Sequence, residues 1–232
     1  MLTFLIFLYL KRHFAQHWVR IGTLFNRFKK YRLSFLLVVF QTVFIFMLPL
    51  SASAQENQLH YKVLFNGNDI GWMRLERTIV GSKINLQLTS EVKAKIIFPI
   101  TIFTKELSTF ENGQLVFSSL LRKTNGKIKT NKQTKLLGDQ YEISEEGGKS
   151  RFKCPLIDAD LLSLYFHEPT ILKSVYWDKK NCFVKVTKTE DGGYQINFSN
   201  GNCNRFYYKN GICTKVKVEH MFYSAEIVFE KQ

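Results

Sequence analysis

The sequence predicts a mostly β domain, built as a strongly curved antiparallel sheet or partly closed barrel with one short helix covering an opening. Beyond residue 55, apolar and polar residues alternate over many short segments, separated by Asn-Gly, Asp-Gly and Gly-Gly pairs. Between residues 158 and 169 the apolar spacing becomes helical, with Leu161, Leu164 and Tyr165 at i, i+3 and i+4. The chain shows no βαβ alternation and no repeat of fixed period, so one antiparallel sheet is expected.

An N-terminal signal segment is expected to precede this domain. Residues 1–54 carry seven basic and no acidic residues, and the apolar run 33–50 is followed by Ala52 and Ala54. This order is typical of a signal peptide with a long basic n-region, cleaved after Ala54. A start assigned too far upstream would explain the length of that region. Residues 55–232 then form a single exported domain in the periplasm or cell envelope. An uncleaved signal anchor is the alternative, because a run of eighteen residues is near the lower limit for spanning a bilayer.

The strands are expected in a regular order along the exported part. Residues 83–93 show the clearest alternation, with Ile84, Leu86, Leu88 and Val92 facing inward, as in a half-buried antiparallel strand. Asn-Gly pairs at 66–67, 112–113, 125–126 and 210–211 predict tight hairpins. The expected strands cover residues 60–65, 70–80, 83–93, 101–110, 115–123, 127–137, a short strand between 139 and 147, and 182–188, 193–198, 205–209, 212–219 and 221–229.

The helical stretch is interpreted as a short plug of about two turns docked on the sheet. Asp158 is expected to cap its first turn, Asp160 to lie near its positive end, and Pro169 to stop it. The candidate positions for a lid or for ligand contact are Leu161, Leu164, Tyr165, Phe166 and His167.

The net charge of +14 suggests a polyanionic partner at first sight, but half of it lies in the leader. A basic run on residues 122–135 contains the candidate anion-binding residues Lys127, Lys129, Lys132 and Lys135. It would suit anionic headgroups or glycan, whereas a solvated hairpin or protected edge strand is the simpler interpretation. No aromatic residues interleave to stack bases, so no nucleic acid partner is expected. Membrane contact is expected only through the leader, unless that leader stays uncleaved.

Cysteine spacing leaves several interpretations open. Export permits disulfides, and the Asp191-Gly192 turn would place Cys182 close to Cys203, so this pair is the favoured disulfide candidate. Buried single thiols are the alternative, because free Cys packs like a small apolar residue. The short paired spacings of zinc sites are absent from the sequence, so no metal is expected, and no cofactor motif is present either.

A hydrolase arrangement is the only catalytic interpretation that the residues suggest. Ser163 precedes His167 by four residues and Glu168 is adjacent. However, no Gly-x-Ser-x-Gly turn surrounds Ser163, and a serine in a docked helix would not present its hydroxyl to substrate. We therefore expect a protein that is not an enzyme.

Three stretches resemble a known family. They are residues 61–67 (YKVLFNG) followed by Ile70-Gly71, residues 160–169 (DLLSLYFHEP) and residues 204–211 (NRFYYKNG). Together they are similar to the exported bacterial β-rich family DUF6134, a domain of unknown function, over about residues 58–230. The resemblance implies export and a wrapped β-sheet, and it implies no activity and no catalytic residues.

Three functions are therefore in competition for the exported domain. The first is a non-catalytic envelope protein that binds an apolar or amphiphilic ligand, or an envelope protein partner, beneath the helical lid. The second is a surface-interaction module that uses the basic hairpin on anionic lipid or glycan. The third is a hydrolase around Ser163 and His167.

Overall fold

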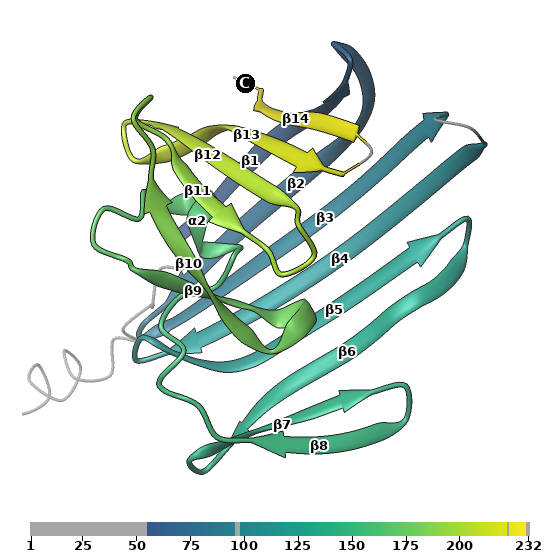
Figure 1. Cartoon of the computed structure of the whole chain (residues 1–232). Helices are drawn as coiled ribbons and strands as arrows, with labels where there is room; N and C mark the ends of the chain where they lie inside the picture. The colour runs from purple at the N-terminus through teal and green to yellow at the C-terminus, as the bar shows by residue number, and fades with distance from the viewer. Residues whose placement is uncertain (1–54, 96–97, 222, 231–232) are drawn as a thin grey trace, which may run out of the picture. The chain divides into compact units, whose positions relative to one another are not determined.

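In the computed structural model, which describes residues 55–95, 98–221 and 223–230, the strands form one fourteen-stranded antiparallel sheet (Figure 1). The order across the sheet is β8-β7-β6-β5-β4-β3-β2-β1-β14-β13-β12-β11-β10-β9. The first and last strands pair with each other, whereas β8 and β9 form the two edges, so the sheet is curved but not closed. This confirms the predicted fold class. The predicted leader falls on residues 1–54, outside the described residues.

The strands run as follows: β1 Gln55–Phe65, β2 Asn68–Val80, β3 Lys83–Lys95, β4 Pro99–Glu111, β5 Gln114–Thr124, β6 Lys127–Leu137, β7 Gln140–Glu145, β8 Gly148–Phe152, β9 Ser174–Trp177, β10 Cys182–Lys188, β11 Tyr194–Asn197, β12 Cys203–Lys209, β13 Ile212–His220 and β14 Tyr223–Phe229. A 3-10 turn, η1 (Asp178–Lys180), links β9 to β10, and the helix α2 covers Ser163–Phe166.

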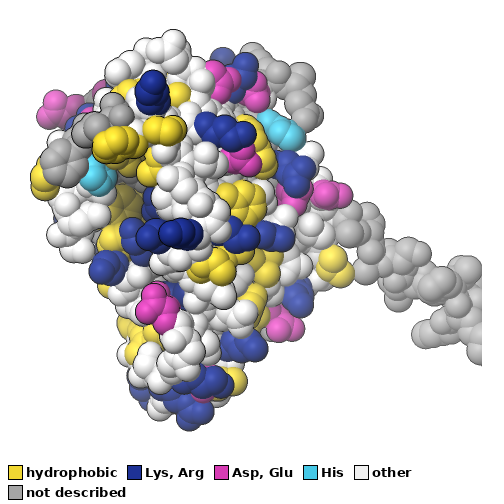
Figure 2. Space-filling model, turned by 90° about the vertical axis from the view of Figure 1, so that its right-hand side faces the viewer, with side chains coloured by type: hydrophobic (Ala, Val, Ile, Leu, Met, Phe, Trp, Pro, Cys, Tyr) yellow, Lys and Arg dark blue, Asp and Glu magenta, His cyan; other side chains and the backbone are white. Residues whose placement is uncertain are grey.

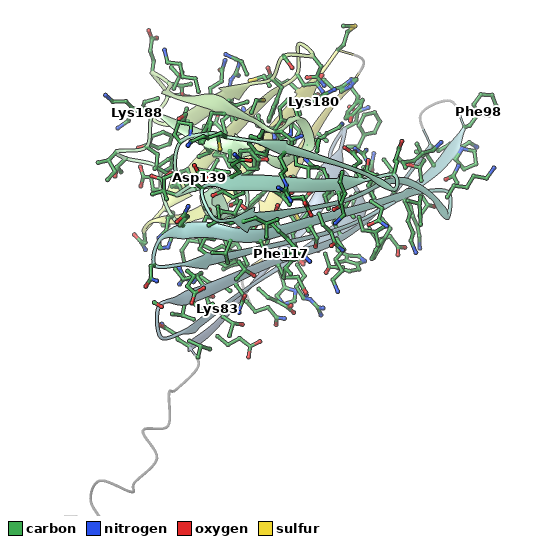
Figure 3. All side chains as sticks on the ribbon, turned by 90° about the horizontal axis from the view of Figure 1, so that it is seen from below. Lys83, Phe98, Phe117, Asp139, Lys180 and Lys188 are labelled. Atoms are coloured by element: carbon green, nitrogen blue, oxygen red, sulfur yellow. The ribbon has the colours of Figure 1, made fainter. Side chains whose placement is uncertain are left out.

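The hairpin turns follow from local backbone chemistry. At the β5–β6 turn, Asn125 and Gly126 both have positive φ, 48° and 76°, and the Asn-Gly pairs at 66–67, 112–113 and 210–211 repeat this conformation. Asn and Gly are the residues that tolerate this geometry, and it suits the right-handed twist of paired strands. Figure 3 shows Lys83 and Phe98 at opposite ends of the long β3–β4 ribbon, and Phe98 is largely exposed at the far end.

The hydrophobic core lies where the C-terminal strands face the inner side of β1–β4. Tyr61 on β1 is fully buried, and its hydroxyl donates to the Cys213 carbonyl at 2.8 Å. Tyr165 on α2 packs edge-on against Tyr61 and Phe206, with ring centroids 5.5 and 5.8 Å apart. Edge-to-face packing of this kind adds to the stabilisation from burial. The helix is therefore held between β1 and the strands β12 and β13.

The helix is shorter than the predicted two turns because the residues before it bond to neighbouring strands. Leu115 donates its backbone N–H to the Ile157 carbonyl at 2.8 Å, and Tyr176 donates to Ala159 at 2.9 Å. His167 ends the helix in an extended conformation, two residues before Pro169. None of the helices in the described part of the chain has the length and apolar character needed to cross a membrane.

The structure does not form the predicted Cys182–Cys203 disulfide, and all four cysteines are free thiols. The register of β10 and β11 pairs Val186 with Ile196, which would place residue 200 opposite Cys182. However, β11 ends at Asn197, and Cys182 instead pairs with Trp177 on β9. The prediction is wrong because it extended the hairpin beyond the point where the chain turns into β12.

Candidate functional site

Two cavities share the segment 158–167 as a wall. The first, called the apolar cavity, has a volume of about 200 Å³ and is lined mainly by Arg77, Ile84, Leu86, Phe110, Phe166 and His167. The second, called the polar cavity, has a volume of about 140 Å³ and is lined by a different set that includes Glu106, Ser108, Arg122, Asp160, Asp178 and Lys179. The same short stretch of chain thus contributes side chains to two chemically different spaces.

Arg77 is the cationic group at the apolar cavity. Its Nη1 lies 3.0 Å from Nε2 of His167, and its guanidinium lies 5.3 Å from the centre of the Phe166 ring. A guanidinium only donates hydrogen bonds, so Nε2 of His167 accepts and the imidazole is neutral, with its proton on Nδ1. Burial, and next the charge of Arg77, lower the pKa of His167, which agrees with this neutral form. Asp158 also lines this cavity, but among the described residues no ion pair within 4 Å joins a carboxylate to Arg77.

The polar cavity is built on the inner face of β4, β5 and β6. Glu106 lies opposite Leu120, and Leu120 lies opposite Lys132, so these three form one inward-facing row across the strands. With neighbouring strands about 4.8 Å apart, the backbones of Glu106 and Lys132 are about 10 Å apart. The next row holds Ser108 and Ser118. Polar side chains thus occupy the inner face of this part of the sheet, and Ser108, Ser118 and Lys132 are buried there.

Lys132 is buried and neutralised by Asp178, so it is not part of an exposed anion-binding surface. Its Nζ lies 2.9 Å from Oδ1 of Asp178 and also donates to the Asp178 carbonyl and the Asn181 side chain. Asp178 also accepts hydrogen bonds from Ser118 at 2.9 Å and Thr134 at 3.2 Å. The anion-binding prediction is wrong for Lys132, because period-two alternation places it on the inner face.

Asp160 is a buried carboxylate whose oxygens are well supplied with donors. It accepts from the Ser108 hydroxyl, and its Oδ1 accepts from Ser163 N at 2.9 Å and Ser163 Oγ at 2.6 Å. Burial raises its pKa, and the hydrogen bonds from the two serines oppose this. Asp160, rather than the exposed Asp158, therefore binds the first backbone N–H of α2, that of Ser163.

The five predicted lid residues do not act as one surface. Leu164 and Tyr165 are in the hydrophobic core, and Leu161 lines the polar cavity. Phe166 and His167 line the apolar cavity, with Phe166 buried and His167 exposed at its rim. The structure brings only the last two together at a cavity with an ionic group, Arg77.

The remaining lysines of the basic run are exposed on the β6 ribbon. Lys127, Lys129 and Lys135 face solvent, and Lys135 Nζ lies 5.9 Å from the centre of the Phe117 ring. On the face shown in Figure 2, Lys and Arg side chains form separate groups with Asp and Glu among them, rather than one continuous basic patch. This arrangement does not single out an anion-binding site.

Ser163 and His167 do not form a nucleophile–base pair. Ser163 Oγ donates to Asp160, and His167 Nε2 is engaged by Arg77. Among the described residues, no group of three or more His, Cys, Asp and Glu side chains is placed to hold a metal ion.

Sequence reasoning missed Arg77, Glu106 and Asp178. Glu106 could have been found, because it alternates with Ser108 and Phe110 on the inward face of β4. Arg77 shares the inward face with Leu75 in the same way. No sequence pattern indicated Asp178, because its partner Lys132 is 46 residues away in the chain.

The family model described as "Domain of unknown function (DUF6134)" matches residues 61–230. A comparison with curated proteins gave no match. Among solved structures, the chain is similar to a β-barrel-like protein of domain of unknown function DUF1849 from Brucella abortus, with 12% identity and a TM-score of 0.51. The similarity covers 77% of this chain and 96% of the other, and it shows a shared fold.

Proposed function

This chain belongs to the DUF6134 family, and we propose that its β domain is a non-catalytic binding protein of the cell envelope that holds a compact anionic amphiphile in the apolar cavity. Such a ligand has an apolar body and one carboxylate or similar head. The observation that carries the proposal is the guanidinium of Arg77 beside a cavity whose other walls are mainly Ile84, Leu86, Phe110 and Phe166.

Arg77 supports recognition of an anionic head because it forms no ion pair within 4 Å among the described residues, although the exposed Asp158 also lines the cavity. Phe166 offers its ring face and His167 offers a neutral nitrogen, and neither removes the need for an anion. A carboxylate could take a bidentate position on the guanidinium, which is the stronger form of such hydrogen bonds. The apolar walls would then bury the ligand body and supply the hydrophobic contribution to binding.

The volume of the apolar cavity limits the ligand. Its 200 Å³ is comparable to an apolar cavity of about 150 Å³ that holds benzene. A single ring or a short alkyl chain fits this space, whereas a long acyl chain would enter only with its end. We therefore infer a short or single-ring carboxylate rather than a membrane phospholipid as the preferred ligand.

Absence of catalysis and location in the envelope are parts of the same proposal. Ser163 and His167 are each bonded to other partners, which supports binding rather than hydrolysis. The signal-like pattern of residues 1–54 supports export. A periplasmic binding protein of this kind would carry or sense its ligand without changing it.

The test is calorimetric titration of the exported domain with hexanoate and with 1-hexanol, which share an alkyl chain but differ in charge. We expect hexanoate to bind more tightly, and we expect Arg77→Gln to remove that preference. Arg74→Gln is the matched control, because Arg74 lies on the same strand, ion-paired to Glu76 at 3.1 Å and away from the cavity. Ile84→Phe, which fills the cavity, should weaken both probes. Equal affinity of the two probes for the wild-type domain, or no binding of either, would overturn the proposal.

A further inference from the structure

The polar cavity contains two oppositely charged side chains that do not pair with each other. Within the described residues, neither the carboxylate of Glu106 nor the guanidinium of Arg122 takes part in a side-chain hydrogen bond or an ion pair within 4 Å. Both nevertheless line the same cavity, on neighbouring strands β4 and β5. By contrast, Asp160 and Asp178 in the same cavity are fully engaged by serine, threonine and lysine donors.

The cationic side of the cavity consists of Arg122 and Lys179. Lys179 is exposed at the rim, and the charge of Arg122 contributes to lowering its pKa after burial, which is the larger cause. Two cations that repel each other at one cavity, neither of them in an ion pair within 4 Å among the described residues, are placed to accept one anionic group. A carboxylate between them would relieve this repulsion.

The acidic side lies deeper, around Glu106. Burial raises the pKa of Glu106 to about 7, and the charges of Asp178 and Asp160 add to the effect, while Arg122 opposes it. Lys132, on the same inward row, is already paired with Asp178. A bound ammonium group beside Glu106 would therefore find a carboxylate that has no competing partner and would favour its ionised form.

We propose that the polar cavity binds a compact zwitterion, with its ammonium group at Glu106 and its carboxylate between Arg122 and Lys179. The volume of 140 Å³ restricts the ligand to the size of a small amino acid or ω-amino acid. This site is separate from the apolar cavity, because Arg77, Phe166 and His167 do not line it. The two cavities share no lining residue, although the segment 158–167 and strand β4 contribute side chains to both.

The test is calorimetric titration of the exported domain with glycine, β-alanine and 4-aminobutyrate, which vary the distance between the two charges. Propionate and propylamine serve as single-charge controls of similar size. At least one zwitterion should bind about tenfold more tightly than either control, since a hydrogen bond to a charged group contributes roughly that factor or more. The Arg77→Gln variant should bind the same zwitterion unchanged, which separates this result from the function proposed for the apolar cavity.

Variants of Glu106 and Arg122 identify which residue binds the ammonium group of the zwitterion and which binds its carboxylate. Glu106→Gln should abolish the preference over propionate, and Arg122→Gln should abolish the preference over propylamine. Glu111→Gln and Lys127→Gln are the matched controls, because both residues are exposed and line neither cavity. Thermal unfolding of each variant establishes that it is folded.

Proton release gives an independent readout. Because burial raises the pKa of Glu106 to about 7, binding of an ammonium group that favours its ionised form should release protons near neutral pH. Titration in phosphate and in Tris buffer measures this release, which Glu106→Gln should remove. The proposal is overturned if no zwitterion binds, if propionate binds as tightly as the best zwitterion, or if Glu106→Gln leaves the preference intact.

Discussion

Asp160 and Ser163 hold each other by hydrogen bonds in both directions. The backbone N–H of Ser163 donates to Asp160 Oδ1 at 2.9 Å, and the backbone N–H of Asp160 donates to Ser163 Oγ at 3.1 Å. Asp160 lines the polar cavity and Ser163 lines the apolar cavity. This reciprocal pair therefore fixes the wall that the two spaces share.

Replacement of Asp160 by alanine is expected to lower the free energy of unfolding by about 2–4 kcal/mol, because it leaves the buried Ser108 hydroxyl and the partly buried Ser163 N–H without acceptors. Urea unfolding at pH 7 measures the change. Asp158→Ala is the control, since Asp158 is exposed and should alter stability by no more than about 0.5 kcal/mol. Equal losses in the two variants would contradict the role assigned to Asp160.

Lys132→Met should destabilise the domain by roughly 3–5 kcal/mol, because it leaves Asp178 without its buried cation. The exposed Lys129, three residues earlier on β6, supplies the control: Lys129→Met should be nearly neutral. The double variant Lys132→Met, Asp178→Asn should lose less than the sum of its two single changes, as a double-mutant cycle would show. Additive losses would mean that the pair does not interact.

Glu106 should make the domain less stable as the pH rises. Its pKa is raised from 4.5 to about 7 in the folded state, so the folded protein binds more protons than the unfolded chain between these values. The stability that Glu106 contributes is full below pH 4.5 and is lost as the pH passes through about 7. Glu106→Gln should accordingly gain on the order of 1–3 kcal/mol over the wild-type domain between pH 4.5 and pH 9.

Urea unfolding of wild type and Glu106→Gln at several pH values tests this expectation. Glu111→Gln, at the exposed end of the same strand, should follow the wild-type profile. An identical pH profile for Glu106→Gln and wild type would show that the carboxyl group is not desolvated in the folded state.

Reducing agent should leave the midpoint of thermal unfolding unchanged, because no disulfide joins the four cysteines. All four thiols should react with a chromogenic disulfide reagent in guanidinium chloride without prior reduction. In the folded domain Cys213 should react last, since it is fully buried and burial raises its pKa to about 12. A midpoint that falls on reduction would indicate a disulfide and would contradict the structure.

The fold was accessible from sequence because its signals are local. The hairpin turns at 66–67, 112–113, 125–126 and 210–211 could be predicted from their Asn-Gly pairs alone, and alternation along β3 correctly placed Leu86 and Leu88 inside. The same alternation would have placed Lys132 and Thr134 inside β6, but their polarity argued for solvent. Burial of Lys132 depends on Asp178, which reaches it from the far end of the sheet, and no local pattern encodes that pairing.

The candidate site could be predicted only in part, because local sequence patterns do not encode contacts between distant strands. The stretch around Phe166 and His167 stood out because its period changes, and it does line a cavity. This stretch lines two cavities rather than one. Which side chains complete each cavity depends on the curvature of the sheet, which brings Arg77 to one cavity and Glu106 and Arg122 to the other. The helix length was overestimated because hydrogen bonds from Leu115 and Tyr176 to residues 157 and 159 compete with helical ones.

Pairing of β1 with β14 has a consequence for the time at which the sheet can assemble. During synthesis β1 emerges first, yet its neighbour on one side is the last strand of the sheet, with Tyr61 opposite Phe229. Until β14 is synthesised, β1–β8 and β9–β13 can form only two separate sheets. These two sheets together have four unpaired edge strands, whereas the complete sheet has two. Unpaired edge strands can pair with other chains and aggregate. A nascent domain of this topology therefore depends on rapid pairing of β14 with β1 or on a chaperone that covers β1.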